Sequence, residues 1–240
     1  MTGQPESDGP EDVTVTAVLV VDVQRDFCLD GALAVPNGGR VVPVLNQILR
    51  AAHARRLTVY ATRDWHPSDS SHFLAGGGPW PVHCVAGSPG ARFHPDLRLP
   101  EGTQVVNKGM TANNDGYSAF EGCLDDGTPL AHDLRHRGVT HLVTGGLATD
   151  YCLRHSVLDA IRGGWRVTLV TDAIAAVELT PNDGEQAAGA FQETATSVPA
   201  HRAGPSAERE QVVSNPLDLR RPIGVELCEA RARIGRERRE

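Results

Sequence analysis

The chain has 240 residues, of which 40% are hydrophobic and 22% are charged, and its formal net charge at pH 7 is −7. This composition is typical of a globular protein, and the acidic charge argues against a nucleic-acid partner, which usually requires a basic excess. No apolar run is long enough to span a bilayer, so no membrane partner is expected. The cysteines, five in number, are scattered at Cys28, Cys84, Cys123, Cys152 and Cys228, which favours reduced thiols and a cytoplasmic location over a disulfide framework.

The length predicts one α/β domain with a full core, flanked by two further segments. Residues 1–12 are acidic and polar and contain two prolines, so a disordered N-terminal tail is predicted there. The domain itself is expected over residues 13–200. Residues 201–240 form a charge-rich C-terminal extension, for which the pattern predicts either a solvated helix or a mobile tail.

Strand and helix patterns alternate along the predicted domain. Runs of β-branched and aliphatic residues predict six strands, at Val13–Val23, Leu57–Thr62, Gln104–Asn107, Val139–Thr144, Trp165–Thr171 and Thr194–Val198. Helical spacing of apolar residues predicts helices at Val41–Arg56 and Pro129–Arg137, after Cys152, and at Asp183–Gln192. This alternation predicts a mainly parallel, six-stranded central sheet with helices on both faces, a three-layer α/β/α fold of the Rossmann-like type.

Ionisable residues stand at the ends of four predicted strands: Asp22, Asp64 with His66, Lys108, and Cys152. In an open parallel sheet, ligand sites lie outside the carboxyl ends of the strands. We therefore predict that Asp22, Lys108 and Cys152 meet in a site for acyl transfer. Asp22 would accept the thiol proton, and Lys108 would hold Asp22 and favour the thiolate. The alternatives are a loop-pinning carboxylate, an exposed lysine and a cysteine that only packs.

Cys152 begins the helix-patterned segment that follows the fourth strand. The start of a helix favours a thiolate, and either Thr149 or Asp150 is expected to cap this helix. The turn before Cys152 leaves the backbone N–H groups of Ala148 and Cys152 free, which predicts an oxyanion hole formed by these two donors.

The segment Trp65–Gly102 breaks the alternation and is rich in Gly, Pro and His, and a loop this long inside a compact domain is usually functional. Asp64, His66, His72 and His83 supply one carboxylate and three imidazoles, which are ligand types that zinc, iron and manganese accept. A single loop histidine is usually only a polar surface residue, but this combination predicts a metal site.

Seven short motifs occur together in the form found in one known family: Val21–Phe27, Gly31–Pro36, Thr62–Pro67, Trp80–Cys84, Lys108–Gly109, Tyr117–Phe120 and Gly146–Cys152. Over residues 15–198 the chain resembles the nicotinamidases, also called pyrazinamidases, of the isochorismatase-like cysteine hydrolase superfamily. The resemblance implies an isochorismatase-like fold and an amidohydrolase that converts nicotinamide and water to nicotinate and ammonia through a thioester. Such a reaction belongs to NAD salvage and pyridine nucleotide biosynthesis.

The resemblance also implies roles by position. The catalytic residues would be Asp22, Lys108 and Cys152. The oxyanion hole would include Ala148 and Cys152, after a cis peptide bond between Leu147 and Ala148. A divalent ion, zinc in the first place and iron or manganese as alternatives, would be held by Asp64, His66, His72 and His83. The ring of the substrate would lie in a pocket lined by Phe27, Trp80 and Tyr117.

Alternatives to nicotinamide hydrolysis stay open. The substrate could be another pyridine or pyrazine carboxamide, and Arg25, which stands where the family commonly has Asn, bears on that choice. A carbamoyl or maleamate-type amidase of the same superfamily would work without a metal, which the histidine-rich loop argues against. A non-enzymatic metal-binding scaffold would have no use for the catalytic residues. The sequence also allows a homo-oligomer, in which the extension after residue 200 would serve assembly.

Overall fold

Seven strands form a single sheet in the residues that the computed structural model describes, which are 14–187, 189, 190 and 211–213. In chain order they are β1 (Thr16–Val21), β2 (Thr58–Asp64), β3 (Gln104–Lys108), β4 (Cys123–Leu124), β5 (His141–Leu147), β6 (Arg166–Ala175) and β7 (Gln211–Val213). Their order across the sheet is β4-β3-β2-β1-β5-β6-β7. All neighbouring strands pair in parallel except β4, which is antiparallel to β3.

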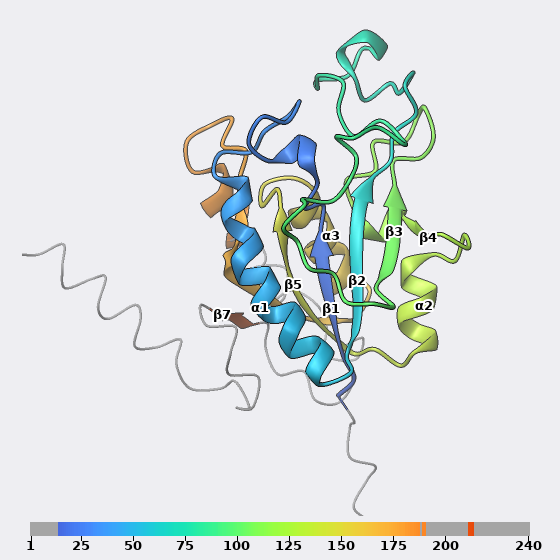
Figure 1. Ribbon diagram of the computed structural model, residues 1–240, viewed down its shortest axis with the longest axis vertical. Coiled ribbons are helices and arrows are strands. Elements are labelled where there is room, and N and C mark those ends of the chain that lie inside the picture. Colours follow the sequence, from blue (N-terminus) through green and yellow to red (C-terminus); the bar gives the residue numbers. More distant parts are fainter. Residues whose placement is uncertain (1–13, 188, 191–210, 214–240) are drawn as a thin grey trace, which may run out of the picture.

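Helices cover both faces of this sheet (Figure 1). Helix α1 (Val41–Ala54) packs on one face, and α2 (Leu130–His136) and α3 (Cys152–Arg162) pack on the other. Short 3₁₀ helices lie in the connections: η1 (Arg25–Phe27), η2 (Gly38–Arg40), η3 (Leu74–Gly76) and η4 (Ala119–Glu121). No helix in the described part of the chain is long and apolar enough to cross a membrane.

Strand β1 shows why both faces are covered. Val18 and Val20 belong to the apolar cluster that includes α1, whereas Leu19 and Val21 belong to the cluster that includes α3. All four residues are at most 2% exposed, and burial of each side chain contributes roughly 1.5–3 kcal/mol. A strand that is apolar on both faces occupies the centre of a parallel sheet, because helices shield it from water on both sides.

The predicted fold class, a mainly parallel sheet between two helical layers, is confirmed. The described sheet contains five of the six predicted strands and two that were not predicted: β4, which has only two residues, and β7, which lies beyond residue 200. The strand predicted at Thr194–Val198 and the tail predicted at residues 1–12 lie outside the described residues. Residues 183–187, 189 and 190 are helical, within the helix predicted at Asp183–Gln192.

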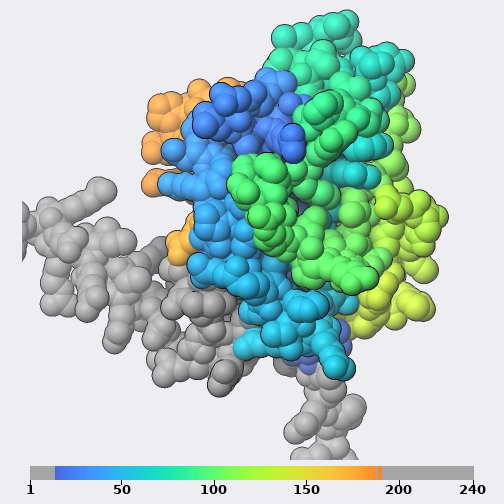
Figure 2. All heavy atoms as spheres, viewed as in Figure 1, coloured from blue at the N-terminus to red at the C-terminus, as the bar shows by residue number. Residues whose placement is uncertain are grey.

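The long connection between β2 and β3 lies on the same face of the sheet as α1. Figure 2 shows its later part, in green, against α1, in blue. Asn46 of α1 donates to the Asp96 carbonyl oxygen and accepts the N–H group of Arg98, each at 2.8 Å. Leu97 joins the apolar cluster around α1. The irregular segment Trp65–Gly102 is therefore fixed against the core, although η3 is its only helical turn.

Candidate active site

Four neighbouring strands bring the predicted catalytic residues to one edge of the sheet. Asp22 follows β1, Asp64 ends β2, Lys108 ends β3, and Cys152 begins α3 after β5. These strands are adjacent in the order β3-β2-β1-β5. Side-chain atoms of Asp22, Asp64 and Cys152 lie within 4.8 Å of one another. The structure thus places the catalytic residues predicted from the sequence in one cluster, with Asp64 as a fourth member.

Lys108 lies at the centre of this cluster and is fully buried. Its Nζ atom is 2.8 Å from Asp22 Oδ2 and 3.3 Å from Cys152 Sγ, and it also pairs with Asp64 Oδ1. It donates a further hydrogen bond to the Gly116 carbonyl oxygen at 2.6 Å. The alternative interpretation of Lys108 as an exposed lysine at a strand end is wrong.

Burial and charge together determine the protonation states of the three charged residues. Burial alone would lower the pKa of Lys108, but Asp22 and Asp64 outweigh it and raise that pKa well above its usual value. Burial would likewise raise the pKa of Asp64, but Lys108 outweighs it and holds that pKa below its usual value. For Asp22 burial prevails over Lys108 and raises the pKa to about 6. Asp22 is therefore ionised at neutral pH, with a pKa suited to a general base.

The Cys152 thiol is protonated in the resting state. Burial raises the pKa of Cys152 well above its usual value; Lys108 opposes this effect, while Asp64 and Asp22 add to it. Lys108 thus favours the thiolate, as predicted, but burial beside two carboxylates outweighs its effect. The thiol proton has to leave during the attack on a substrate, and Asp22 is the neighbouring group that can accept it.

The turn between β5 and α3 presents free backbone donors. The Leu147–Ala148 peptide bond is cis. In the described residues, neither the Ala148 N–H group nor the Cys152 N–H group donates a hydrogen bond to the protein. The turn can approach β1 because Gly146 has no side chain, since a Cβ atom there would lie 2.0 Å from the Val21 carbonyl oxygen. Two unpaired donors next to the thiol are suited to stabilising an oxyanion.

Asp150 does not cap α3, contrary to the prediction. Its carboxylate accepts the N–H groups of Val177 and Glu178 at 3.0 and 2.9 Å, and α3 has no side-chain cap. Thr149 does not replace it, because Thr149 Oγ1 has no hydrogen-bond partner among the described residues. Asp150 instead fixes the segment that follows β6, and the Cys152 N–H group at the start of α3 stays available to a ligand.

Three histidines form a second cluster beside Asp64. Each ring donates from Nδ1 to a fixed acceptor: His66 to the Gly109 carbonyl oxygen at 3.1 Å, His72 to the Asp115 carboxylate at 3.1 Å, and His83 to the Pro81 carbonyl oxygen at 2.8 Å. Carbonyl and carboxylate oxygens only accept hydrogen bonds, so in the neutral form of each ring the proton lies on Nδ1. This tautomer leaves the Nε2 lone pair of every ring free for a metal ion.

The donor atoms of this histidine cluster fit a divalent metal. One nitrogen from each ring lies within 4.8 Å of the others, and Asp64 Oδ2 is 3.7 Å from His66 Nε2 and 4.0 Å from His83 Nε2. His66 Nε2 is buried and has no hydrogen-bond partner in the described part of the chain. Burial lowers the pKa of His72, and it lowers the pKa of His83 to about 4. Neutral imidazoles with a carboxylate are a ligand set that zinc accepts.

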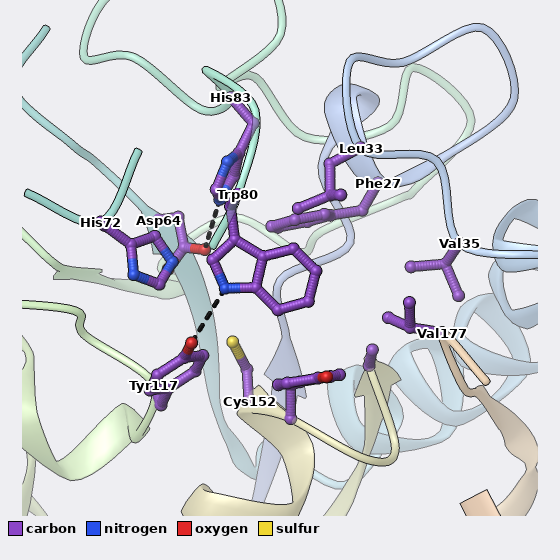
Figure 3. A pocket seen from close by; sticks show the side chains of 12 residues that line it. Phe27, Leu33, Val35, Asp64, His72, Trp80, His83, Tyr117, Cys152 and Val177 are labelled. Carbon is purple, nitrogen blue, oxygen red and sulfur yellow. Dashed lines mark hydrogen bonds and ion pairs between the residues drawn. The ribbon is translucent and has the colours of Figure 1, made fainter. Parts of the chain in front are cut away.

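Residues of both clusters line one pocket (Figure 3). The aromatic residues predicted to line it, Phe27, Trp80 and Tyr117, all do so. Trp80 donates from Nε1 to the Tyr117 hydroxyl at 2.9 Å. Cys152 lines the pocket as well, as do Asp64, His72 and His83. The lining combines aromatic walls with a few convergent polar groups, which is typical of a small-molecule site.

Several pocket residues are absent from the sequence-based prediction: Leu33, Val35, Tyr151 and Val177. The first three lie inside the motifs Gly31–Pro36 and Gly146–Cys152, so their place in the motifs is the signal that could have identified them. The Tyr151 ring meets Trp80 edge to face, with ring centroids 4.9 Å apart. Val177 follows β6 and carries no comparable signal.

Comparisons with known proteins agree with this geometry. The family model of the Isochorismatase domain matches residues 16–198. The chain is 38% identical to a nicotinamidase of Escherichia coli over 71% of this chain and 88% of that protein. It is 42% identical to a nicotinamidase/pyrazinamidase of Mycobacterium tuberculosis over 67% and 87% of the two chains. The solved pyrazinamidase of Pyrococcus horikoshii in complex with zinc is similar in structure, with a TM-score of 0.70, 36% identity and coverage of 83% and 98%.

Proposed function

Since the chain belongs to the isochorismatase family, we propose that it is a nicotinamidase, an amidohydrolase that converts nicotinamide and water to nicotinate and ammonia. One observation carries this proposal: Cys152, in contact with buried Lys108, faces a pocket whose other end is formed by neutral histidines. The relatives named nicotinamidase support the choice of substrate.

In the first half of the proposed reaction, Cys152 Sγ attacks the carboxamide carbon while the thiol proton passes to Asp22. The N–H groups of Ala148 and Cys152 would hold the oxyanion, and one such donor typically contributes about 2.7–4 kcal/mol. Asp22 then gives its proton to the amide nitrogen, the C–N bond breaks, and ammonia leaves a thioester on Cys152. Lys108 stays protonated and keeps the Asp22 carboxylate in place.

In the second half, a water molecule attacks the thioester carbon and gives a proton to Asp22. The C–S bond then breaks, the proton on Asp22 passes to Cys152 Sγ, and the product leaves as nicotinic acid, which loses its carboxyl proton to water to become nicotinate. Asp22 is ionised at the beginning and the end of both halves, so the site needs no other base.

The residues that would hold the divalent ion are Asp64, His66, His72 and His83. When bound, zinc, or iron or manganese in its place, supplies a Lewis acid that would hold the ring nitrogen of nicotinamide and orient its carboxamide toward Cys152. The zinc in the similar pyrazinamidase structure supports zinc as the first candidate. Asp64 also pairs with Lys108, so it links the metal ligands to the catalytic cluster.

Chelation tests both the substrate and the metal. Ammonia release from nicotinamide by the purified protein is expected to fall at least about tenfold after treatment with a chelator and to recover when zinc is added. The control is the same chelator already saturated with zinc, which should have no effect. Chelation-insensitive hydrolysis of a carbamoyl substrate, without hydrolysis of nicotinamide, would instead identify the metal-free type of amidase.

The pKa of Asp22 predicts how activity depends on pH. Protonated Asp22 cannot accept the thiol proton, so kcat/KM for nicotinamide should fall as the pH drops below an apparent pKa of about 6. The fall should approach tenfold per pH unit below about pH 5. The rate should be measured with saturating zinc, and the bound metal should be assayed at each pH to exclude loss of the ion. A constant kcat/KM from about pH 5 to pH 8 would contradict the role of Asp22.

We further propose that the reaction serves NAD salvage in the cytoplasm. All cysteines in the described residues are free: Cys28, Cys84, Cys123 and Cys152. Reduced cysteines are typical of the cytoplasm, and the proposed mechanism itself needs a reduced Cys152.

A further inference from the structure

The segment 109–117 supplies no proposed metal ligand, yet it contacts two of the three histidines. It lies between β3 and η4. The Gly109 carbonyl oxygen accepts the Nδ1 proton of His66 at 3.1 Å, and Asp115 Oδ1 accepts that of His72 at 3.1 Å. The partner of His83 is different, because it is the Pro81 carbonyl oxygen within the same loop. Segment 109–117 is therefore the support on which two ligand rings are oriented.

Asp115 is held in place although its side chain is 56% exposed. On its C-terminal side, the Gly116 carbonyl oxygen accepts a hydrogen bond from buried Lys108 at 2.6 Å, and the Gly116 N–H group donates to Asn114 Oδ1 at 2.7 Å. Nearer the start of the segment, the Ala112 carbonyl oxygen accepts the N–H group of Ser71 at 2.7 Å. These backbone contacts fix the position from which the Asp115 carboxylate reaches His72.

The contact between Asp115 and His72 differs in chemistry from the other two. The Nδ1 atoms of His66 and His83 are bonded to backbone carbonyl oxygens, whereas that of His72 is bonded to the Asp115 carboxylate. A carboxylate holds a ring by a charge-assisted hydrogen bond and makes its other nitrogen a stronger ligand. As a surface ion pair the same contact would contribute little to folding stability. Its expected effect is therefore on metal binding.

We propose that Asp115 is a positioning residue for the metal site: it fixes the His72 ring with its proton on Nδ1 and its Nε2 atom toward the ion. This inference rests on the proposed function only in that both place an ion among His66, His72 and His83. It adds a residue that neither the sequence motifs nor the proposed ligand set contains.

The test is the zinc affinity of the full-length protein, measured by competition with a chromophoric chelator. The Asp115→Ala substitution is expected to weaken zinc binding by about 10–100-fold. Asp115→Asn keeps a neutral acceptor and should have an intermediate effect. The matched control is Asn113→Ala on the same segment, because Asn113 is exposed and takes no part in the hydrogen bond between Asp115 and His72. The zinc affinity of this control should stay within about twofold of the unchanged protein.

A second measurement separates positioning from a merely structural effect. Two-bond ¹H–¹⁵N correlation spectra of the zinc-stripped, full-length protein report which nitrogen of each neutral histidine carries the proton. His72 is expected to be protonated at Nδ1 in the unchanged protein and to become a mixture of tautomers in Asp115→Ala. The midpoint of urea unfolding in the absence of zinc should be the same for both.

The outcomes distinguish this inference from the proposed function. The role of Asp115 is overturned if Asp115→Ala binds zinc within about twofold of the unchanged protein, or if its His72 tautomer is unchanged. This holds even if the protein hydrolyses nicotinamide. A loss of zinc affinity together with the tautomer change supports that role even if the protein hydrolyses no nicotinamide, in which case only the proposed function fails.

Discussion

The Cys152→Ser variant is expected to lose nicotinamide hydrolysis, with kcat lowered by at least about 10³-fold. A serine hydroxyl is far less acidic than a thiol, and Asp22, with a pKa of about 6, is too weak a base to deprotonate it. Lys108 and the backbone donors of the turn would remain, but they do not replace a nucleophile. Ammonia release under saturating nicotinamide measures the effect.

The control for this substitution is Cys123→Ser. Cys123 is a free, half-buried cysteine on β4, whereas Cys152 lines the pocket. Its kcat should stay within about twofold of the unchanged protein, because a substitution away from the site perturbs it little. Quenching of tryptophan fluorescence by nicotinamide should show that Cys152→Ser still binds the substrate. A Cys152→Ser variant that keeps a tenth or more of the activity would contradict the assignment of the nucleophile.

The Lys108→Met variant should lose both activity and stability. Methionine removes the ammonium group that Asp22 and Asp64 share inside the protein, and leaving a buried charge without its partner typically costs about 3–5 kcal/mol. The free energy of unfolding in urea at neutral pH should fall by that amount. The loss should shrink as the pH is lowered, since protonation of the two carboxylates removes their charge.

Arg162→Met is the matched control for the stability measurement. Arg162 also pairs with a carboxylate, that of Asp159, but its side chain is 64% exposed. The free energy of unfolding should change by no more than about 0.5 kcal/mol. Equal losses in the two variants, or a Lys108→Met loss that does not depend on pH, would contradict the account of a shared buried cation.

The sequence was sufficient to predict the catalytic cluster because parallel strands share a direction. Asp22, Lys108 and Cys152 each stand at the carboxyl end of an apolar run, and strands that run in parallel bring such ends to one edge. The histidine loop could be predicted from residue types alone, since three imidazoles and a carboxylate seldom gather in one short segment without a ligand. Two strands were not predicted, because β4 has only two residues and β7 only three, which is too short for a pattern of apolar residues to show.

Properties that depend on surroundings could not be read from the sequence. Whether Cys152 rests as a thiol depends on how deeply it is buried and on the opposing effects of Lys108 and the carboxylates. Whether Asp150 caps α3 or reaches the segment after β6 depends on tertiary contacts at Val177 and Glu178. The pairing of His72 with Asp115 spans 43 residues, and no local pattern predicts a contact at that distance along the chain.

The central claim is that Cys152 and the carboxamide form a covalent intermediate. The most direct test of this claim is to trap the thioester with hydroxylamine. Hydroxylamine competes with water for a thioester and converts it to a hydroxamic acid. The ratio of nicotinohydroxamate to nicotinate should therefore rise in proportion to the hydroxylamine concentration, and neither product should form with Cys152→Ala. Formation of nicotinate alone, at hydroxylamine concentrations that readily cleave a model thioester, would show that water attacks nicotinamide directly and would contradict the mechanism.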